Sequence, residues 1–131
     1  MQDGSVWVAG QNQHGQLGDG TRIDRHGFQR VLYDGAEAVA TGSYHSIILM
    51  QDGSIATTGD NKFGQLGGSS AQVKDGFVKV ISGGVKSIAA GCRHSMALKR
   101  GGSVWVTGDN NYGQLGDGTS QAKSGFIQVT N

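Results

Sequence analysis

Gly15-Gln16-Leu17-Gly18 is the first of three identical stretches, because Gly-Gln-Leu-Gly returns at residues 64–67 and again at residues 113–116. Successive copies begin 49 residues apart. A constant interval of this length indicates an array of repeated structural units rather than one irregular domain. The rest of the sequence is therefore compared one repeat at a time.

A short strand is predicted ahead of each copy. Ser-Val-Trp-Val-Ala-Gly at 5–10 corresponds to Ser-Ile-Ala-Thr-Thr-Gly at 54–59 and to Ser-Val-Trp-Val-Thr-Gly at 103–108. β-Branched and aromatic residues that end in glycine are typical of a strand. Each strand follows a dipeptide suited to a tight hairpin turn, at Asp3-Gly4, Asp52-Gly53 and Gly101-Gly102.

The loop that leads into Gly-Gln-Leu-Gly carries an asparagine in every copy, at Asn12, Asn61 and Asn110. An asparagine side chain can bond the backbone two residues further on, and the glycines permit a compact loop. We expect the single leucine of each loop to be buried. The structural positions assigned to these loops are Gly15, Leu17, Gly64, Leu66, Gly113 and Leu115.

Each unit ends in a further strand, at residues 27–31, 76–80 and 125–129, whose alternating pattern predicts a half-exposed outer strand. A second block occurs twice between these units. Small apolar residues at 35–42 and 84–91 predict a tightly packed inner strand.

The runs that start at His45 and His94 predict the neighbour of that inner strand. One period thus holds four short strands joined by hairpins. Four-stranded antiparallel sheets of about 50 residues, repeated head to tail, are the blades of a β-propeller. The Trp-Asp dipeptide of WD repeats is absent, and the glycine pairs at 83–84 and 101–102 do not recur at the repeat interval, as kelch repeats require. The sequence predicts an all-β propeller.

The chain is too short to close a propeller alone. Its 131 residues hold about 2.7 repeats, whereas closed propellers have four to eight blades. We expect half a blade at about 1–33 and full blades at about 34–82 and 83–131, with ten strands in all. The remaining blades come either from a longer parent chain, which we favour, or from self-association that covers the open faces and edges.

Charge and composition argue against several kinds of partner. The 11 basic and 10 acidic residues give a net charge of +1, which offers no field for nucleic acid or an anionic membrane. The 24 glycines disfavour helices, and no signal peptide or spanning segment is recognisable. Cys92 is the lone cysteine, so no internal disulfide forms. We expect an intracellular protein, cytoplasmic or nuclear.

No catalytic, metal-binding or cofactor-binding residue is expected. His45 and His94 each precede a serine, but adjacent strand residues point to opposite faces and cannot act as base and nucleophile. We expect both histidines to form hydrogen bonds between blades. The Asp109-x-Asn111 pair lacks the remaining acids of a calcium loop, and no glycine loop continues as Gly-Lys-Ser or Gly-Lys-Thr.

Basic residues recur at one point of the long polar loop and suggest a surface for an acidic partner, although solvated loop charges would explain them equally well. The residues assigned to partner binding are Arg22, Arg25, Arg30, Lys74 and Lys123. Trp7 and Trp105 stand at matching positions. These tryptophans either anchor a partner at an interface or pack between neighbouring blades.

Together these motifs resemble the regulator of chromosome condensation repeat family. Its unit combines an inner strand ending in glycine, a His-Ser strand and Gly-x-Asn-x-x-Gly-Gln-Leu-Gly, and the likeness covers nearly the whole chain. The family often has proline where this chain has Phe28, Phe77 and Phe126.

The resemblance implies a β-propeller and several alternative functions. We expect a non-catalytic protein-interaction module, and the alternative is a portion of a guanine nucleotide exchange factor for a small GTPase. Family members that exchange nucleotide carry an inserted wedge hairpin, for which the even repeat spacing leaves no room within these units. Ultraviolet sensing implies a tryptophan where this chain has Cys92 and Ser43. Inhibition of a secreted hydrolase is a further role in the family.

Overall fold

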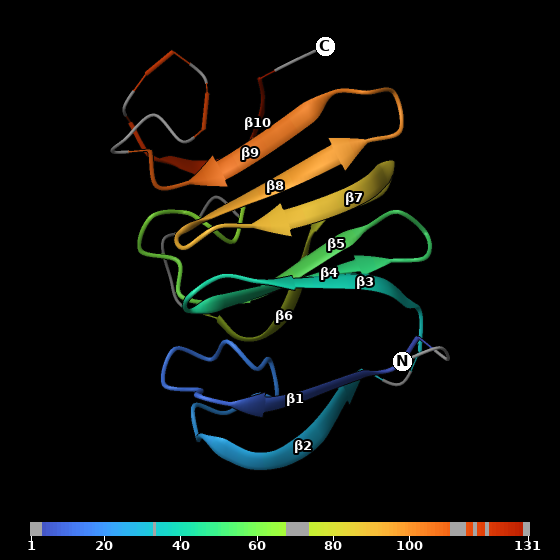
Figure 1. The fold of residues 1–131 in the computed structure, drawn as a ribbon, viewed down its shortest axis with the longest axis vertical. Coiled ribbons are helices and arrows are strands. Elements are labelled where there is room, and N and C mark those ends of the chain that lie inside the picture. The colour runs from blue at the N-terminus through green and yellow to red at the C-terminus, as the bar shows by residue number, and fades with distance from the viewer. Residues whose placement is uncertain are drawn as a thin grey trace.

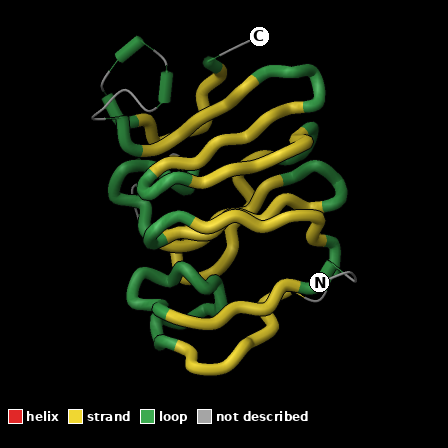
Figure 2. Tube along the Cα trace, viewed as in Figure 1, coloured by secondary structure: helices red, strands yellow, loops and turns green. Residues whose placement is uncertain are grey.

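A computed structural model of the chain consists of strands joined by loops and turns (Figures 1 and 2). The structure describes residues 4–32, 34–67, 74–110, 115–116, 118–119 and 121–129, with the backbone alone at positions 74, 75 and 124. Within these ranges there is no helix with the length and apolar character needed to cross a membrane.

Ten strands are described, in three antiparallel sheets that are stacked along the long axis of the molecule (Figure 1). The first sheet pairs β1 (Val6–Gly10) with β2 (Arg25–Leu32). The second has the order β3 (Ala36–Thr41), β4 (His45–Met50), β5 (Ile55–Gly59) and β6 (Lys74–Ile81). The third repeats that order with β7 (Val85–Ala90), β8 (His94–Lys99), β9 (Val104–Gly108) and β10 (Lys123–Gln128). The predicted all-β fold, a partial propeller of about 2.5 blades, is confirmed.

The predicted turns agree with the structure, but the predicted burial of the outer strands does not. Gly53 has φ +85° and Gly102 has φ +93°, as the predicted hairpin turns require. The alternation predicted for the outer strand is wrong in β2, where five consecutive residues are exposed. This strand lies at the end of the stack (Figure 1), and the described residues form no further sheet over its outward face.

The hydrophobic core lies between the second and third sheets. Ile47, Leu49 and Ile55 come from the second sheet and pack with Val85 and Ala97 of the third. Each of these side chains is at most 1% exposed. Burial of one such aliphatic side chain contributes about 1.5–3 kcal/mol, so the sheets are held together chiefly by their facing apolar side chains.

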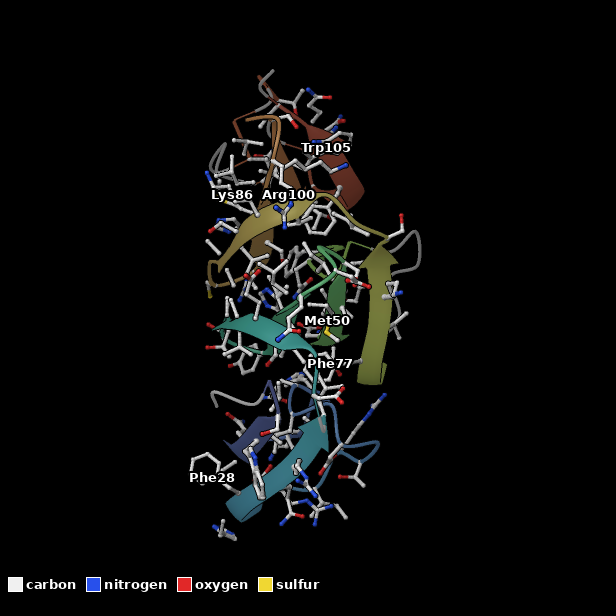
Figure 3. All side chains as sticks on the ribbon, turned by 90° about the vertical axis from the view of Figure 1, so that its right-hand side faces the viewer. Phe28, Met50, Phe77, Lys86, Arg100 and Trp105 are labelled. Carbon is white, nitrogen blue, oxygen red and sulfur yellow. The ribbon has the colours of Figure 1, made fainter. Side chains whose placement is uncertain are left out.

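A glycine of one sheet also makes room for an aromatic ring of the next sheet. A side chain at Gly18 would overlap with the ring of Phe77, and one at Gly67 would overlap with the ring of Phe126. Phe77 lies at the junction of the first two sheets, whereas Phe28 projects from the end of the stack (Figure 3) and is 71% exposed. The last glycine of Gly-Gln-Leu-Gly therefore serves packing between sheets.

Candidate functional site

The loop after β1 is organised around the buried side chain of Asn12. Its Oδ1 accepts a hydrogen bond from the backbone N–H of Leu17 at 3.0 Å. Its Nδ2 donates to the carbonyls of Thr21 at 3.0 Å and Ile23 at 3.1 Å. One amide therefore ties together both limbs of the loop.

The same arrangement recurs in the other loops. The amide oxygen of Asn61 accepts from Leu66 N at 3.0 Å, and that of Asn110 accepts from Leu115 N at 3.0 Å. Leu66 and Leu115 are each 2% exposed, and Leu17 is 7% exposed, so these leucines are buried as the sequence predicts. Gly113 lies outside the described residues.

The predicted partner of the asparagine is wrong. The amide two residues beyond Asn12 belongs to His14, and it donates to Oε1 of Gln16 at 2.9 Å. The equivalent amide of Phe63 donates to Oε1 of Gln65 at 3.0 Å. The glutamine of Gly-Gln-Leu-Gly thus closes the short turn, while the asparagine reaches the leucine five residues on.

Hydroxyl groups of the following sheet hold the loops at 15–18 and 64–67 through their main-chain carbonyls. The donors and acceptors are Thr58 to Gly15 (2.7 Å), Ser46 to Gln16 (2.7 Å), Thr107 to Gly64 (2.6 Å) and Ser95 to Gln65 (2.6 Å). These two loops therefore each belong to one sheet in sequence but are fixed by the next sheet in space.

His45 forms the hydrogen bond between sheets that the sequence predicts. Its Nε2 lies 3.1 Å from Oγ of Ser95. The single hydroxyl proton of Ser95 is donated to Gln65 O, so Ser95 must accept the Nε2–H of a neutral imidazole. Burial lowers the pKa of His45 to about 4. Its Nδ1 is buried and has no hydrogen-bond partner among the residues that the structure describes.

This histidine and serine do not form a nucleophile and its base. A nucleophilic serine gives its proton to the histidine, but here the serine proton points to a carbonyl. Both side chains are at most 1% exposed, so no substrate reaches them. Burial also lowers the pKa of His94, the equivalent residue in the next repeat. Within the described ranges, no group of three His, Cys, Asp or Glu side chains is arranged to hold a metal ion.

Three of the predicted basic positions lie at one end of the sheets, which we call the loop rim. The loop rim carries the loops that contain Gly-Gln-Leu-Gly and the β3–β4 and β7–β8 turns (left in Figure 1). Arg25, Lys74 and Lys123 begin β2, β6 and β10, where they pair with the glycines that end β1, β5 and β9. Whether their side chains bind a partner stays a prediction.

The basic side chains at the predicted positions differ in whether their charge is already paired within the chain. Arg25 forms an ion pair with Asp19 at 2.9 Å. Although burial opposes ionisation of Asp19, hydrogen bonds from Thr21 and Arg25 lower its pKa to about 2. Arg22 is exposed.

Arg30 is separated from the loop rim. It lies five residues further along β2 than Arg25, a distance of about 16 Å at 3.3 Å per residue. Its guanidinium stacks over the ring of Trp7, with Cζ 5.3 Å from the centroid. Trp7 is 39% exposed, whereas Trp105 packs against the core, so the matching tryptophans have different environments.

Sequence reasoning missed two contacts between neighbouring sheets at the loop rim. The rings of His14 and Tyr44 lie 4.5 Å apart. One repeat later, Cζ of Arg93 lies 5.0 Å from the ring centroid of Phe63. In both cases the residue before Gly-Gln-Leu-Gly meets the residue before the histidine of the next sheet, and that constant offset is the signal that could have identified the contacts.

Two sequence models of one family match this chain, and both are described as Regulator of chromosome condensation (RCC1) repeat. One matches residues 3–49, and the other matches residues 37–65 and 85–114. Together they cover more than half of the chain. The chain belongs to the RCC1 repeat family. No curated protein sequence gives a significant match to these RCC1 repeats.

Solved structures share the fold of these RCC1 repeats. Prp20p from Saccharomyces cerevisiae, described with its binding properties to Gsp1p and histones, has 24% identity and a TM-score of 0.78. Yeast RCC1 (Prp20) bound to Kap60 has 22% identity and a TM-score of 0.79, and human WBSCR16 has 24% identity and a TM-score of 0.81. Each comparison covers 97% of this chain but only 33–35% of the other, so the RCC1 repeats described here span about a third of those proteins.

Proposed function

We propose that these RCC1 repeats are part of a protein-interaction module that binds a protein partner through the loop rim without transforming it. The predicted half blade at about 1–33 and full blades at about 34–82 and 83–131 belong to this proposal. Further blades of a longer chain, or further copies, would complete the scaffold. The localisation expected for the module is cytoplasmic or nuclear.

The observation that carries the proposal is the construction of the loop rim. Buried asparagines fix the loops internally, and hydroxyls of the next sheet fix them externally. Tyr44 and Arg93 lie in the adjoining turns, where their carbonyls accept from the backbone N–H groups of Asp60 and Asp109 at 2.9 Å. The side chains of His14, Tyr44, Phe63 and Arg93 are therefore presented on rigid supports. Aromatic and arginine side chains held in this way are typical of interaction hot spots.

Charge indicates the kind of partner that the loop rim fits. Arg93 and Arg22 are exposed, and Lys62 in the loop before Gly-Gln-Leu-Gly is exposed as well. Cations beside aromatic rings favour an acidic segment of a partner protein. The predicted contributions of Lys74 and Lys123 would add to the same side of the rim.

The test uses the chain as bait, identifies captured proteins and then measures the affinity of the identified partner for defined variants. Arg93→Glu should weaken binding at least tenfold, because it reverses an exposed charge of the loop rim. Arg100→Glu is the matched control, since Arg100 lies in the β8–β9 turn on the opposite rim (Figure 3). Equal loss in both variants, or in neither, would refute binding through the loop rim.

The second candidate is a portion of a guanine nucleotide exchange factor. It is favoured by the likeness in fold to Prp20p, which is described as binding Gsp1p. A nucleotide-release assay with Gsp1p distinguishes the two functions. Binding without accelerated release supports the interaction module, and accelerated release supports exchange.

A further inference from the structure

An apolar groove runs between the first and second sheets, at the junction where Met50 and Phe77 lie (Figure 3). Its volume is about 390 Å³, and its apolar walls are formed by Val31, Leu32, Ile48, Met50, Ala56 and Phe77. A groove of about 430 Å³ recurs between the second and third sheets, with Val80, Ile81, Lys99, Trp105 and Phe126 at matching positions. No residue of β1 lines the first groove, so the groove belongs to the junction between the sheets and not to the unpaired edge of β1.

The two grooves differ at the position of Ala56. Its counterparts in the other repeats are Trp7 and Trp105. Trp105 packs against the core between the second and third sheets and forms part of the wall of the second groove. Ala56 is half-buried and lines the first groove. The first junction therefore lacks the indole ring that the next junction contains.

Each of the two tryptophans has a serine and a cation as companions. The indole N–H of Trp7 and that of Trp105 donate to the hydroxyl of the serine two residues earlier, at 3.1 and 3.0 Å. Cζ of Arg30 lies 5.3 Å from the ring centroid of Trp7, and Nζ of Lys99 lies 4.1 Å from that of Trp105. A hydrogen bond thus holds the edge of each ring, and cation–π attraction holds its face.

The same companions are present beside Ala56, where there is no ring. Ser54 stands two residues earlier, and its hydroxyl donates its proton to Oδ1 of Asp52 at 2.6 Å. The lone pairs of that hydroxyl can accept a further hydrogen bond. Lys79 lies opposite Ala56 in the β5–β6 pairing, as a cation lies opposite the tryptophan of β1. Ser54 and Lys79 both line the groove, so an acceptor and a cation border a space without an aromatic ring.

We propose that this groove binds the side chain of a tryptophan that a partner protein presents. The indole ring lies against Met50 and Phe77, its N–H donates to Ser54, and Lys79 covers its face. Thioether and aromatic side chains make favourable contacts with a ring, and an ammonium group is complementary to the negative face of the ring. The groove extends to the β4–β5 turn, at the end of the sheets opposite the loop rim, so this site is separate from binding through the loop rim.

The chemistry of the groove favours tryptophan over other apolar side chains. Leucine or valine would contact the apolar walls but would offer nothing to Ser54 or Lys79. Phenylalanine has a ring face for the cation but no donor for the hydroxyl. Tryptophan supplies both, and it is the side chain that the equivalent positions of this chain already hold in the same setting.

The experiment titrates the isotope-labelled full chain with N-acetyl-tryptophanamide and follows the backbone amides by nuclear magnetic resonance. The expected result is a saturable shift at Ser54 and Ala56, with a dissociation constant of about 0.1–1 mM. The analogue methylated at the indole nitrogen should bind at least fivefold more weakly, and N-acetyl-leucinamide should give no saturable shift. The peptide Gly-Gly-Trp-Gly-Gly should bind at least as tightly as free indole, as a side chain presented by a protein requires.

Matched variants test the separate contacts. In S54A, the natural and the methylated probe should bind equally, because the acceptor of the indole N–H is gone. A56W gives the groove a ring of its own and should weaken binding at least tenfold. K79Q should weaken binding at least threefold, whereas K86Q, an exposed lysine of β7 (Figure 3), should leave it unchanged.

The comparison of probes uses the unaltered chain, so it decides the matter even if a variant is unstable. Absence of a saturable shift, equal binding of the leucine probe, or shifts confined to the loop rim would overturn the proposal. Equal binding of the methylated probe to the natural chain would refute the role of Ser54. Binding of free indole without binding of the peptide would overturn the assignment to a partner protein.

Discussion

Replacing Asn12 with alanine tests whether the buried amide organises the loop. The side chain is 0% exposed and receives the backbone N–H of Leu17, which is buried too. The substitution leaves that donor unsatisfied, at a cost of about 1–3 kcal/mol, and also releases the carbonyls of Thr21 and Ile23. Because these two residues are less buried, water can replace part of their bonds. We expect a total loss of about 2–3 kcal/mol in the free energy of unfolding.

The assay is urea denaturation of the full chain, followed by tryptophan fluorescence and circular dichroism. Gln13→Ala is the matched control, since Gln13 lies in the same loop and is exposed. The control should change the free energy of unfolding by less than about 0.5 kcal/mol. If Asn12→Ala costs no more than the control, the loop is held by something other than its buried amide, and our account of the repeat is refuted.

Two further predictions concern contacts between the sheets. The pKa of His45 is about 4 in the folded protein and 6.5 in the unfolded protein. Protonation of His45 therefore favours unfolding, and the free energy of unfolding should fall by about 3 kcal/mol as the pH is lowered from 6.5 to 4. Denaturation at several pH values should show this loss in the natural chain and not in His45→Gln. Gly18→Ala should cost about 1–3 kcal/mol more than Gly20→Ala, because both glycines have positive φ but only Gly18 faces the ring of Phe77. Equal costs in thermal or urea denaturation would contradict that packing role.

The strand order could be predicted from sequence because its signals are local and recur. Each strand is bounded by glycine or by a turn dipeptide. Because Gly-Gln-Leu-Gly occurs three times at a constant interval, the same strand assignment applies to each repeat. The buried leucines follow from the same pattern, since each loop offers a single large apolar side chain.

Contacts between repeats could not be predicted in the same way. A period shows that Gln16 and Gln65 are equivalent, but it does not show that each receives a hydroxyl from the next sheet. The common local bond of an asparagine predicts a partner two residues on, but in the structure its side-chain oxygen accepts the buried amide of the leucine. Sequence proximity groups Arg30 with Arg25, but the length of β2 separates the two positions in space.

The same long-range bonds explain why the rim can vary from one repeat to the next. The two loops at 15–18 and 64–67 are held by hydrogen bonds to main-chain carbonyls and by the asparagine and glutamine side chains, and none of these bonds uses the side chain of the residue before Gly-Gln-Leu-Gly. That position is His14 in one repeat and Phe63 in the next, and its partner changes from Tyr44 to Arg93. A scaffold that is stabilised by its backbone leaves these side chains free to be selected for a partner. In the proposed module, structural and recognition residues would thus be interleaved in one loop but depend on different atoms.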